Sequence, residues 1–428
     1  MKRSLKIPFK GLSSEAWLNL LLLALVTIFV INFLFPLIQG EWCKAIDFCG
    51  YYSAGRVMNE GKGLDIYNQE ILEKKQVELF SSLNMSEKDA EFIPIVYLPV
   101  FLLPFRLFAL FDFPVSLLLW YLLNFSALAL YLSYFSKKVS EDKPNLKVFI
   151  LLFISYPVLQ NFMYGQINVW LLICIAEFIR AVVSEKPYKA GLWLGGWLVK
   201  PQLLVLILVF LLVQKKYKVI LGFFLSSAAL LIVSWLLVGG EGIRDFINLI
   251  FESVEGGAAS HFEYMMNWRM LSFYVSYFTS PTVGWIFLGL TSTVTAGAPL
   301  LAFRKKLQVI SPQFAIALLG ILAATTAVSY HAHLHTAMIL IPILLYLYMK
   351  GYMKLRPVLI WVAIPYGVNL ALYVLSTLIL ANVLPIKLGS IIEIVFGIGL
   401  LIVNLFLLGW SISNRRFEDE SLKLEPVS

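Results

Sequence analysis

Long apolar runs recur along almost the whole chain, with short polar segments between them. Many reach the roughly 20 residues that an α-helix needs to cross the hydrocarbon of a bilayer. The first, from about Trp17 to Leu37, follows a basic N-terminal stretch and resembles a signal sequence. It is longer than the roughly 7–15 apolar residues of a signal peptide, and no small-residue cleavage site follows it. The pattern therefore predicts an uncleaved first span, with the N-terminus in the cytoplasm.

The composition agrees with a membrane protein. Of the 428 residues, 60% are hydrophobic and 14% are charged, and the mean hydropathy is +0.81. Soluble globular chains are roughly 45–50% apolar and about 25% charged. The net charge of +8 could point to nucleic acid, but basic residues in a membrane protein normally mark cytoplasmic loops. We therefore expect a lipid bilayer and no nucleic acid among the partners.

Two apolar segments can each be interpreted in two ways. Residues 92–111 form either a span or a helix at the outer interface, and residues 190–213 form either one span or two half-helices broken at Lys200-Pro201. Only the interfacial helix and the broken pair together place the basic residues near 137–147 and 186–189 in the cytoplasm, as the positive-inside rule favours. A single span would also hold Lys200 near mid-bilayer, at a cost of about 2.5–3.5 kcal/mol. The broken interpretation is therefore preferred.

The predicted fold is an all-α, polytopic integral membrane protein with a single membrane-embedded domain over residues 1–428. It has about 12 transmembrane segments, including the two short half-helices. Both termini are cytoplasmic, and the two large external segments are 39–113, which contains the interfacial helix, and 239–270. The spans are expected near 17–38, 114–136, 147–163, 167–183, 190–200, 201–213, 219–238, 271–300, 312–330, 336–349, 357–380 and 389–412.

The first external segment carries a candidate general base. It begins with EWCKAIDFCGYYSAGRVMNEGKGLDIYN, in which Asp47 follows the first span beside an aromatic group that includes Tyr52. An acid at the interface with an aromatic wall can remove a proton from a hydroxyl, although a solvated carboxylate is the simpler explanation for this residue taken alone. Cys43 and Cys49 in the same segment either form a disulfide in an oxidising compartment or remain thiols.

Further polar residues gather at predicted external ends of spans. Tyr97 in FIPIVYLPVFLLPF shapes a lipid-facing groove or anchors the interface, and Gln166 and Asn168 in YPVLQNFMYGQINVW offer amides to sugar hydroxyls. Lys200 is an intramembrane cation whose natural partner is an anion, and the half-helix after it points its N-terminal dipole at the same place. Its alternatives are an internal ion pair or a lysine that snorkels to the interface. Arg269 in HFEYMMNWRMLSFY suits a bidentate phosphate contact or snorkels to the interface.

The motif SYHAHLHT adds three histidines at another predicted external end. His331 and His335 have the i, i+4 spacing of a helical metal pair, so zinc is one interpretation. No cysteine or carboxylate lies in the motif to complete a ligand set. Hydrogen bonding or phosphate contact is therefore favoured, and neither a metal nor a cofactor is expected.

The chain resembles glycosyltransferase family 87 of the GT-C superfamily of membrane glycosyltransferases, a family that includes phosphatidylinositol-mannoside mannosyltransferases. The matching motifs, in order, are IDFCGYYSAGRVMNEGKGLDIY, VYLPVFLLPF, YGQINVWLL, AGLWLGGWLVKPQLLVLILVF, MNWRML and SYHAHLH. The resemblance implies a polyprenyl-phosphate sugar donor, an external active site and an acidic base at Asp47. It also implies cavity positions for Gln166, Lys200, Arg269 and the histidines. The chain departs from the family in having Tyr-Leu-Pro for the frequent Tyr-Pro-Pro, and alternating histidines for a Trp with an adjacent His.

The expected reaction is transfer of a hexose, mannose by default, from polyprenyl phosphate to a hydroxyl of a glycolipid or glycan acceptor, with inversion. Asp47 would take the hydroxyl proton, and the donor phosphate would be bound by Lys200, Arg269, His331 and His335. The sugar or acceptor would be bound by Tyr52, Tyr97, Gln166 and Asn168. One alternative is an O-antigen-type polymerase or ligase, which uses lipid diphosphates. The other is a lipid-linked sugar transporter, which would carry inverted repeats and polar residues at its cytoplasmic span ends; neither feature is evident.

Overall fold

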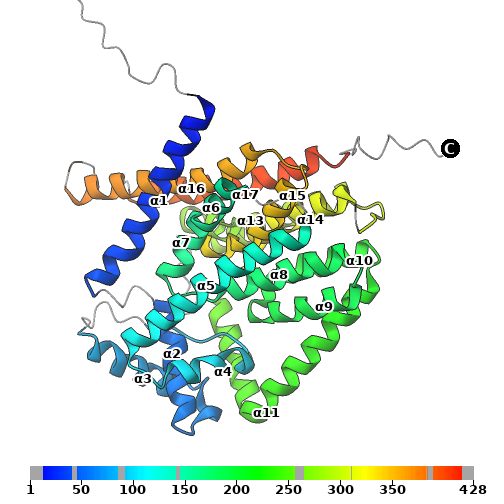
Figure 1. The fold of residues 1–428 in the computed structure, drawn as a ribbon. Coiled ribbons are helices and arrows are strands. Elements are labelled where there is room, and N and C mark those ends of the chain that lie inside the picture. The colour runs from blue at the N-terminus through cyan, green and yellow to red at the C-terminus, as the bar shows by residue number, and fades with distance from the viewer. Residues whose placement is uncertain are drawn as a thin grey trace, which may run out of the picture.

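The computed structural model is an assembly of packed helices (Figure 1). It describes residues 13–40, 46–84, 92–140, 145–255, 265–309, 311–381, 383 and 389–416. Within these ranges the regular secondary structure is helical, apart from one isolated β-bridge between Met265 and His333, so the all-α prediction is confirmed. Cys43 lies outside the described residues, and the predicted alternatives for Cys43 and Cys49 therefore stay open.

Six helices in the described part of the chain are long and apolar enough to cross a membrane. Two shorter helices meet at 42° and would together make a seventh span, α6 (Leu146–Phe153) and α7 (Tyr156–Met163). These features support a multi-pass membrane protein, whereas the count of about 12 segments remains a prediction. The six are α1 (Ser14–Ile38), α5 (Phe113–Val139), α11 (Tyr217–Glu255), α13 (Pro281–Ala302), α16 (Leu355–Leu380) and α17 (Gly389–Ser413).

The predicted first external segment is largely helical. It forms α2 (Ile46–Asn59), η2 (Gly63–Asp65), α3 (Gln69–Ser82) and α4 (Pro99–Phe108), which lie together below α5 in Figure 1. Residues 92–98 are not helical, because prolines disfavour the helical conformation in the residue before them and here stand at 94 and 99. The helix predicted within 92–111 is therefore the shorter α4. It packs closely on α2, where a side chain at Gly55 would meet the Phe105 carbonyl.

The break predicted at Lys200-Pro201 is present. The chain passes from α9 (Pro187–Gly195) through η3 (Gly196–Val199) and η4 (Pro201–Leu203) into α10 (Val205–Val213), and Lys200 itself has the non-helical angles φ −136° and ψ 74°. The Trp197 indole nitrogen donates to the Leu171 carbonyl at 3.0 Å and so holds η3 against α8 (Asn168–Val183). On its other side, α9 packs on α11 so closely that Gly191 and Gly222 leave no room for a side chain.

The second large segment predicted as external, 239–270, is helical in its first part, because α11 continues as helix to Glu255. Gly239 has φ 68° and ψ −174°, a conformation that favours glycine, and α11 bends there into two arms (Figure 1). In the second arm, the side chains of Phe246 and Leu249 are buried, and Phe246 packs against the Tyr67 ring beside η2.

The single span predicted at 271–300 is wrong, because two helices occupy this part of the chain. They are α12 (Trp268–Phe278) and α13. Ser280 has an extended backbone and caps α13 by accepting from the Val283 amide, while Pro281, which lacks an N–H, begins the new helix. The carboxyl-terminal half also contains α14 (Pro312–Val328), η6 (Leu334–Leu340) and α15 (Ile341–Met349). Nearly every residue of α14 is buried, which makes this helix a centre of the core.

Candidate active site

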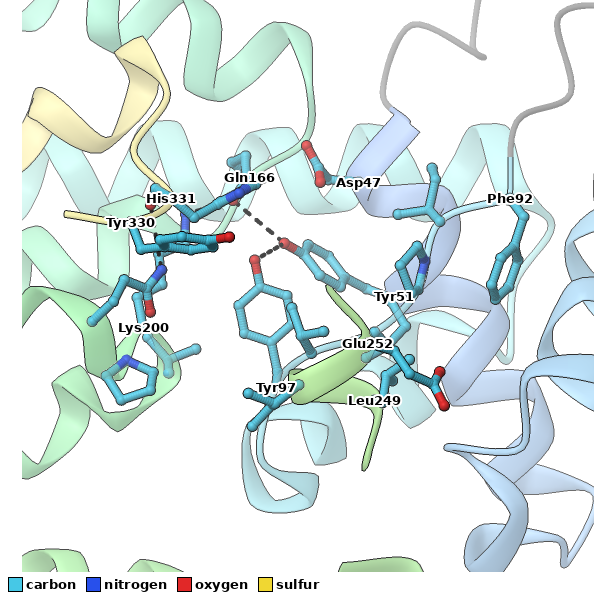
Figure 2. Close-up of a pocket in the computed structure, with 18 of the residues that line it drawn as sticks. Asp47, Tyr51, Phe92, Tyr97, Gln166, Lys200, Leu249, Glu252, Tyr330 and His331 are labelled. Atoms are coloured by element: carbon cyan, nitrogen blue, oxygen red, sulfur yellow. Dashed lines mark hydrogen bonds between the residues drawn. The ribbon is translucent and has the colours of Figure 1, made fainter. Parts of the chain in front are cut away.

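A cavity of about 410 Å³ collects most of the predicted site residues. Its volume lies in the range of ligand pockets, roughly 300–1,000 Å³. Its walls come from α2, the 92–97 stretch, the turn before α8, the break around Lys200, the second arm of α11 and the segment between α14 and η6. Figure 2 shows Asp47, Gln166, Lys200 and His331 around one space.

Asp47 is the second residue of α2, and its backbone N–H donates to the Tyr164 carbonyl at 3.2 Å. This bond joins the start of α2 to the turn that carries Gln166. The Asp47 side chain is half-buried, because its carboxyl opens to the cavity while the rest of its surroundings is protein. Burial raises the pKa of Asp47 to about 6, while a hydrogen bond from Gln166 and the charge of Lys200 oppose the rise. A carboxyl group with this pKa is mostly a base at neutral pH.

The Gln166 amide connects the acid to the cation. Its Oε1 accepts from the Lys200 ammonium at 3.2 Å and lies 3.4 Å from the Tyr51 hydroxyl. The Tyr51 hydroxyl also lies 3.0 Å from the Tyr97 hydroxyl, and Figure 2 shows these two contacts as dashed lines. Tyr97 therefore lies in the cavity and joins, through Tyr51, a network centred on Gln166 that runs from Asp47 to Lys200.

The Lys200 side chain is buried, with 6% of its surface exposed. Its ammonium donates to Gln166 Oε1 at 3.2 Å and to Asn168 Oδ1 at 2.9 Å, both of which are neutral amide oxygens. The Asn168 Nδ2 in turn contacts His335 Nδ1 at 2.9 Å. Asn168 is therefore held between Lys200 and His335, and it is a neighbour of the cavity rather than part of its lining.

Arg269 lies at the same end of the cavity as His331. Asn267 caps α12 by accepting from the Met270 amide and donates to the Ser329 carbonyl at 2.8 Å, so the start of α12 is fixed to the end of α14. The Arg269 guanidinium lies 3.2 Å from the centre of the Tyr330 ring and donates to the Tyr330 carbonyl. Burial, with His333, Lys200 and Arg269 nearby, lowers the pKa of His331 well below its usual value, so this imidazole is neutral at pH 7.

Asn168 and Tyr52 are the two predicted site residues that do not line the cavity, and Tyr52 also lies apart from its network. Its hydroxyl donates to the Phe111 carbonyl at 2.8 Å, and it does not line the cavity. Tyr51, which the sequence interpretation did not select, takes that position. Asp47 and Tyr51 are four residues apart on α2 and so share a face, whereas Tyr52 points to a different side. The i, i+4 spacing would have identified Tyr51 if this segment had been predicted as a helix.

The opposite end of the cavity is apolar with a polar rim. Residues 92–96, Leu249 and Ile250 supply the apolar wall. At the rim, Gln69 Nε2 donates to Glu252 Oε2 at 2.5 Å and links α3 to the second arm of α11. Sequence reasoning missed this rim, since it required the helical continuation of α11 beyond the Gly239 bend.

The arrangement combines a base, amides, two buried cations and an apolar wall in one chamber. Among the described residues, no group of three or more His, Cys, Asp or Glu is placed to hold a metal ion. The positive charge in the cavity comes from Lys200 and Arg269.

Comparison with known proteins identifies the family of the chain. The model of glycosyltransferase family 87 matches residues 96–329, more than half of the chain. This range contains Tyr97, Gln166, Lys200 and Arg269 but not Asp47. Comparison with curated proteins and with solved structures gave no significant match. The chain belongs to glycosyltransferase family 87 and is a membrane glycosyltransferase.

Proposed function

We propose that the protein transfers a hexose, mannose by default, from a polyprenyl-phosphate donor to a hydroxyl of a glycolipid or glycan acceptor. We place the reaction on the external face of the cell membrane, with both termini in the cytoplasm. The observation that carries the proposal is the shared cavity of Asp47, Lys200 and Arg269. A base and two cations within one enclosed space match the needs of a transfer that deprotonates an acceptor and releases a phosphate.

Asp47 is the general base. The acceptor oxygen forms a bond to the anomeric carbon while its proton moves to the Asp47 carboxylate. The bond from the anomeric carbon to the phosphate oxygen breaks on the opposite face, so the configuration inverts. A carboxyl with a pKa of about 6 suits this task, because it is ionised at pH 7 and still accepts a proton more readily than an ordinary aspartate.

Lys200 and Arg269 receive the leaving group. Negative charge grows on the departing phosphate monoester in the transition state, and fixed cations in a water-poor site stabilise such charge strongly. The Lys200 ammonium has two neutral amide acceptors, which orient it without neutralising it. His331 and His335 complete this end of the cavity as hydrogen-bonding groups.

The donor sugar and the lipid tail use the remaining walls. Gln166 and Tyr97 offer an amide and a hydroxyl close to Asp47, which suits recognition of sugar hydroxyls. The apolar surface of residues 92–96, Leu249 and Ile250 suits the first isoprene units of the donor. Asn168 acts by holding Lys200, which replaces the sugar contact first expected of it.

The test is incubation of the purified protein in liposomes with a synthetic polyprenyl-phosphate mannose and a mixture of hydroxyl-bearing lipids. Release of polyprenyl phosphate with a new mannosylated product is the expected result. Movement of intact donor across the liposome membrane without release would instead identify a transporter. Activity confined to lipid-diphosphate donors would identify a polymerase or ligase.

A further inference from the structure

A second concentration of charge lies away from the cavity, on two turns between apolar helices. One turn joins α10 to α11, and the other joins α13 to α14. Gln214 is fully buried between them. Its Nε2 donates to the Phe303 and Lys305 carbonyls at 2.6 and 3.2 Å, and its Oε1 accepts from the Leu307 amide at 2.8 Å. These bonds fix the two turns into one surface.

This surface carries six cations, which are Lys215, Lys216, Lys218, Arg304, Lys305 and Lys306. Lys216 serves the packing, since its ammonium donates to the Leu307 carbonyl at 2.9 Å and lies 5.6 Å from the centre of the Phe314 ring. The other five are exposed. Burial lowers the pKa of Lys216 and the charge of Lys306 lowers it further, so the cations of the two turns act on each other.

The positive charge of this surface is not balanced by carboxylates of the described residues. In the described ranges, none of the six cations forms an ion pair, whereas Lys75 pairs with Glu60 and Lys147 pairs with Glu15. Gln214 fixes the two turns that carry these cations, so they share one surface in spite of their repulsion. A bound anion would relieve this repulsion, and Lys and Arg bind phosphate with charge-assisted hydrogen bonds.

Exposed apolar side chains stand directly beside these cations. Leu212, Tyr217 and Leu301 are 52%, 61% and 68% exposed, and α11 and α13 are candidate membrane spans that have an end here. Such an edge suits the level of lipid headgroups, where apolar side chains meet acyl chains and basic side chains meet phosphate. We propose that the Gln214 surface, defined as Lys215, Lys218 and 304–306 fixed by Gln214, binds the phosphate groups of anionic phospholipids.

The test is native mass spectrometry of the full chain released from nanodiscs of equal phosphatidylglycerol and phosphatidylcholine. Retained phosphatidylglycerol should exceed phosphatidylcholine several-fold for the wild type. The exposed triple change R304Q/K305Q/K306Q should remove most of this excess. The control K62Q/K74Q/R244Q removes the same charge from exposed sites outside the surface and should keep the excess.

Gln214→Ala separates a built site from charge alone, because it loosens the turns and removes none of the cations. It should reduce the excess, with the folded state checked by thermal melting. Equal retention by the wild type and the triple variant would overturn the proposal. So would an excess that appears only after removal of residues 417–428, because the acidic tail FEDESLKLEPVS would then be the occupant.

Discussion

Two buried clusters of charge in this protein differ in how their charges are satisfied. In α8, the Glu177 carboxylate accepts from Nε and Nη2 of Arg180, one turn along the same helix, and from the Tyr131 hydroxyl at 2.7 Å. The Glu177 carboxylate and the Arg180 guanidinium are three residues apart in sequence, and their charges neutralise each other. This cluster is complete without a ligand.

The Lys200 cluster is built from distant parts of the chain and remains incomplete. Its ammonium meets only the amide oxygens of Gln166 and Asn168 among its hydrogen-bond acceptors in the described residues, and Asp47 contributes charge from across the cavity. Neutral amides orient a buried cation but do not cancel its charge, so an anionic ligand gains by binding there. The comparison indicates two roles for buried charge in this protein. A charge that faces a cavity and has no oppositely charged hydrogen-bond partner, such as Lys200, points to a functional role, whereas a charge that a neighbouring side chain neutralises, such as Glu177, points to a structural one.

The largest effect on transfer is expected for Asp47→Asn. The amide cannot take the hydroxyl proton, so kcat should fall about 10²–10⁴-fold while the protein remains folded and inserted. The matched control is Asp65→Asn in η2 of the same segment, which should keep near-normal turnover. Near-normal turnover by the Asp47 variant would show that Asp47 is not the general base.

Lys200→Gln should be the next most severe change. It removes the cation that faces the leaving phosphate and keeps polar contact with Gln166 and Asn168, so kcat should fall about 10²–10³-fold. The exposed Lys189→Gln, on the helix that leads to the same break, should be silent. If Lys200→Gln and Lys189→Gln have equal kcat values, Lys200 has a structural role like that of Glu177 and Arg180.

Arg269→Lys should have a smaller effect. Lysine keeps the charge but loses the planar group that stacks on Tyr330 and can bind phosphate through two nitrogens, so kcat/KM for the donor should fall about tenfold. Steady-state kinetics at varied donor concentration would measure this loss. An unchanged kcat/KM would place Arg269 outside the phosphate site.

Glu177→Gln should leave transfer within about twofold of wild type and lower stability by roughly 1–3 kcal/mol, because the charge of Arg180 loses its partner. Thermal melting in detergent with a parallel activity assay would measure both. A large loss of transfer in a stably folded variant would contradict the division between the two clusters.

Much of the fold could be predicted from local patterns. The apolar runs and the positive-inside rule predicted the break at Lys200-Pro201, because a buried lysine before a proline is costly in a continuous span. The continuation of α11 past Gly239 could not be predicted, since glycine both ends and bends helices. The same holds for the division into α12 and α13, where the Ser-Pro start of a helix lies inside an otherwise continuous apolar run.

The site could be predicted in its residue types more than in its contacts. Asp47, Gln166, Lys200 and Arg269 were selected because they lie at predicted external ends of spans and because the resemblance to glycosyltransferase family 87 places them in the cavity. Tyr52 was chosen instead of Tyr51 because the segment was not predicted to be helical. Without the helical spacing, nothing in the sequence shows which of the two tyrosines shares a face with Asp47. Likewise, no local pattern shows that Asn168 holds Lys200, because this contact joins positions 32 residues apart.

The pH dependence of kcat/KM tests most directly whether the base and the cation share one cavity. The pKa of Asp47 is raised from 3.8 to about 6, so the wild-type rate should fall about tenfold for each pH unit below about 6, as the base becomes protonated. Lys200 holds that pKa down, so the residual activity of Lys200→Gln should lose its base at a higher pH than the wild type. A wild-type acid limb near pH 4, or one that does not move in the Lys200 variant, would contradict the shared cavity.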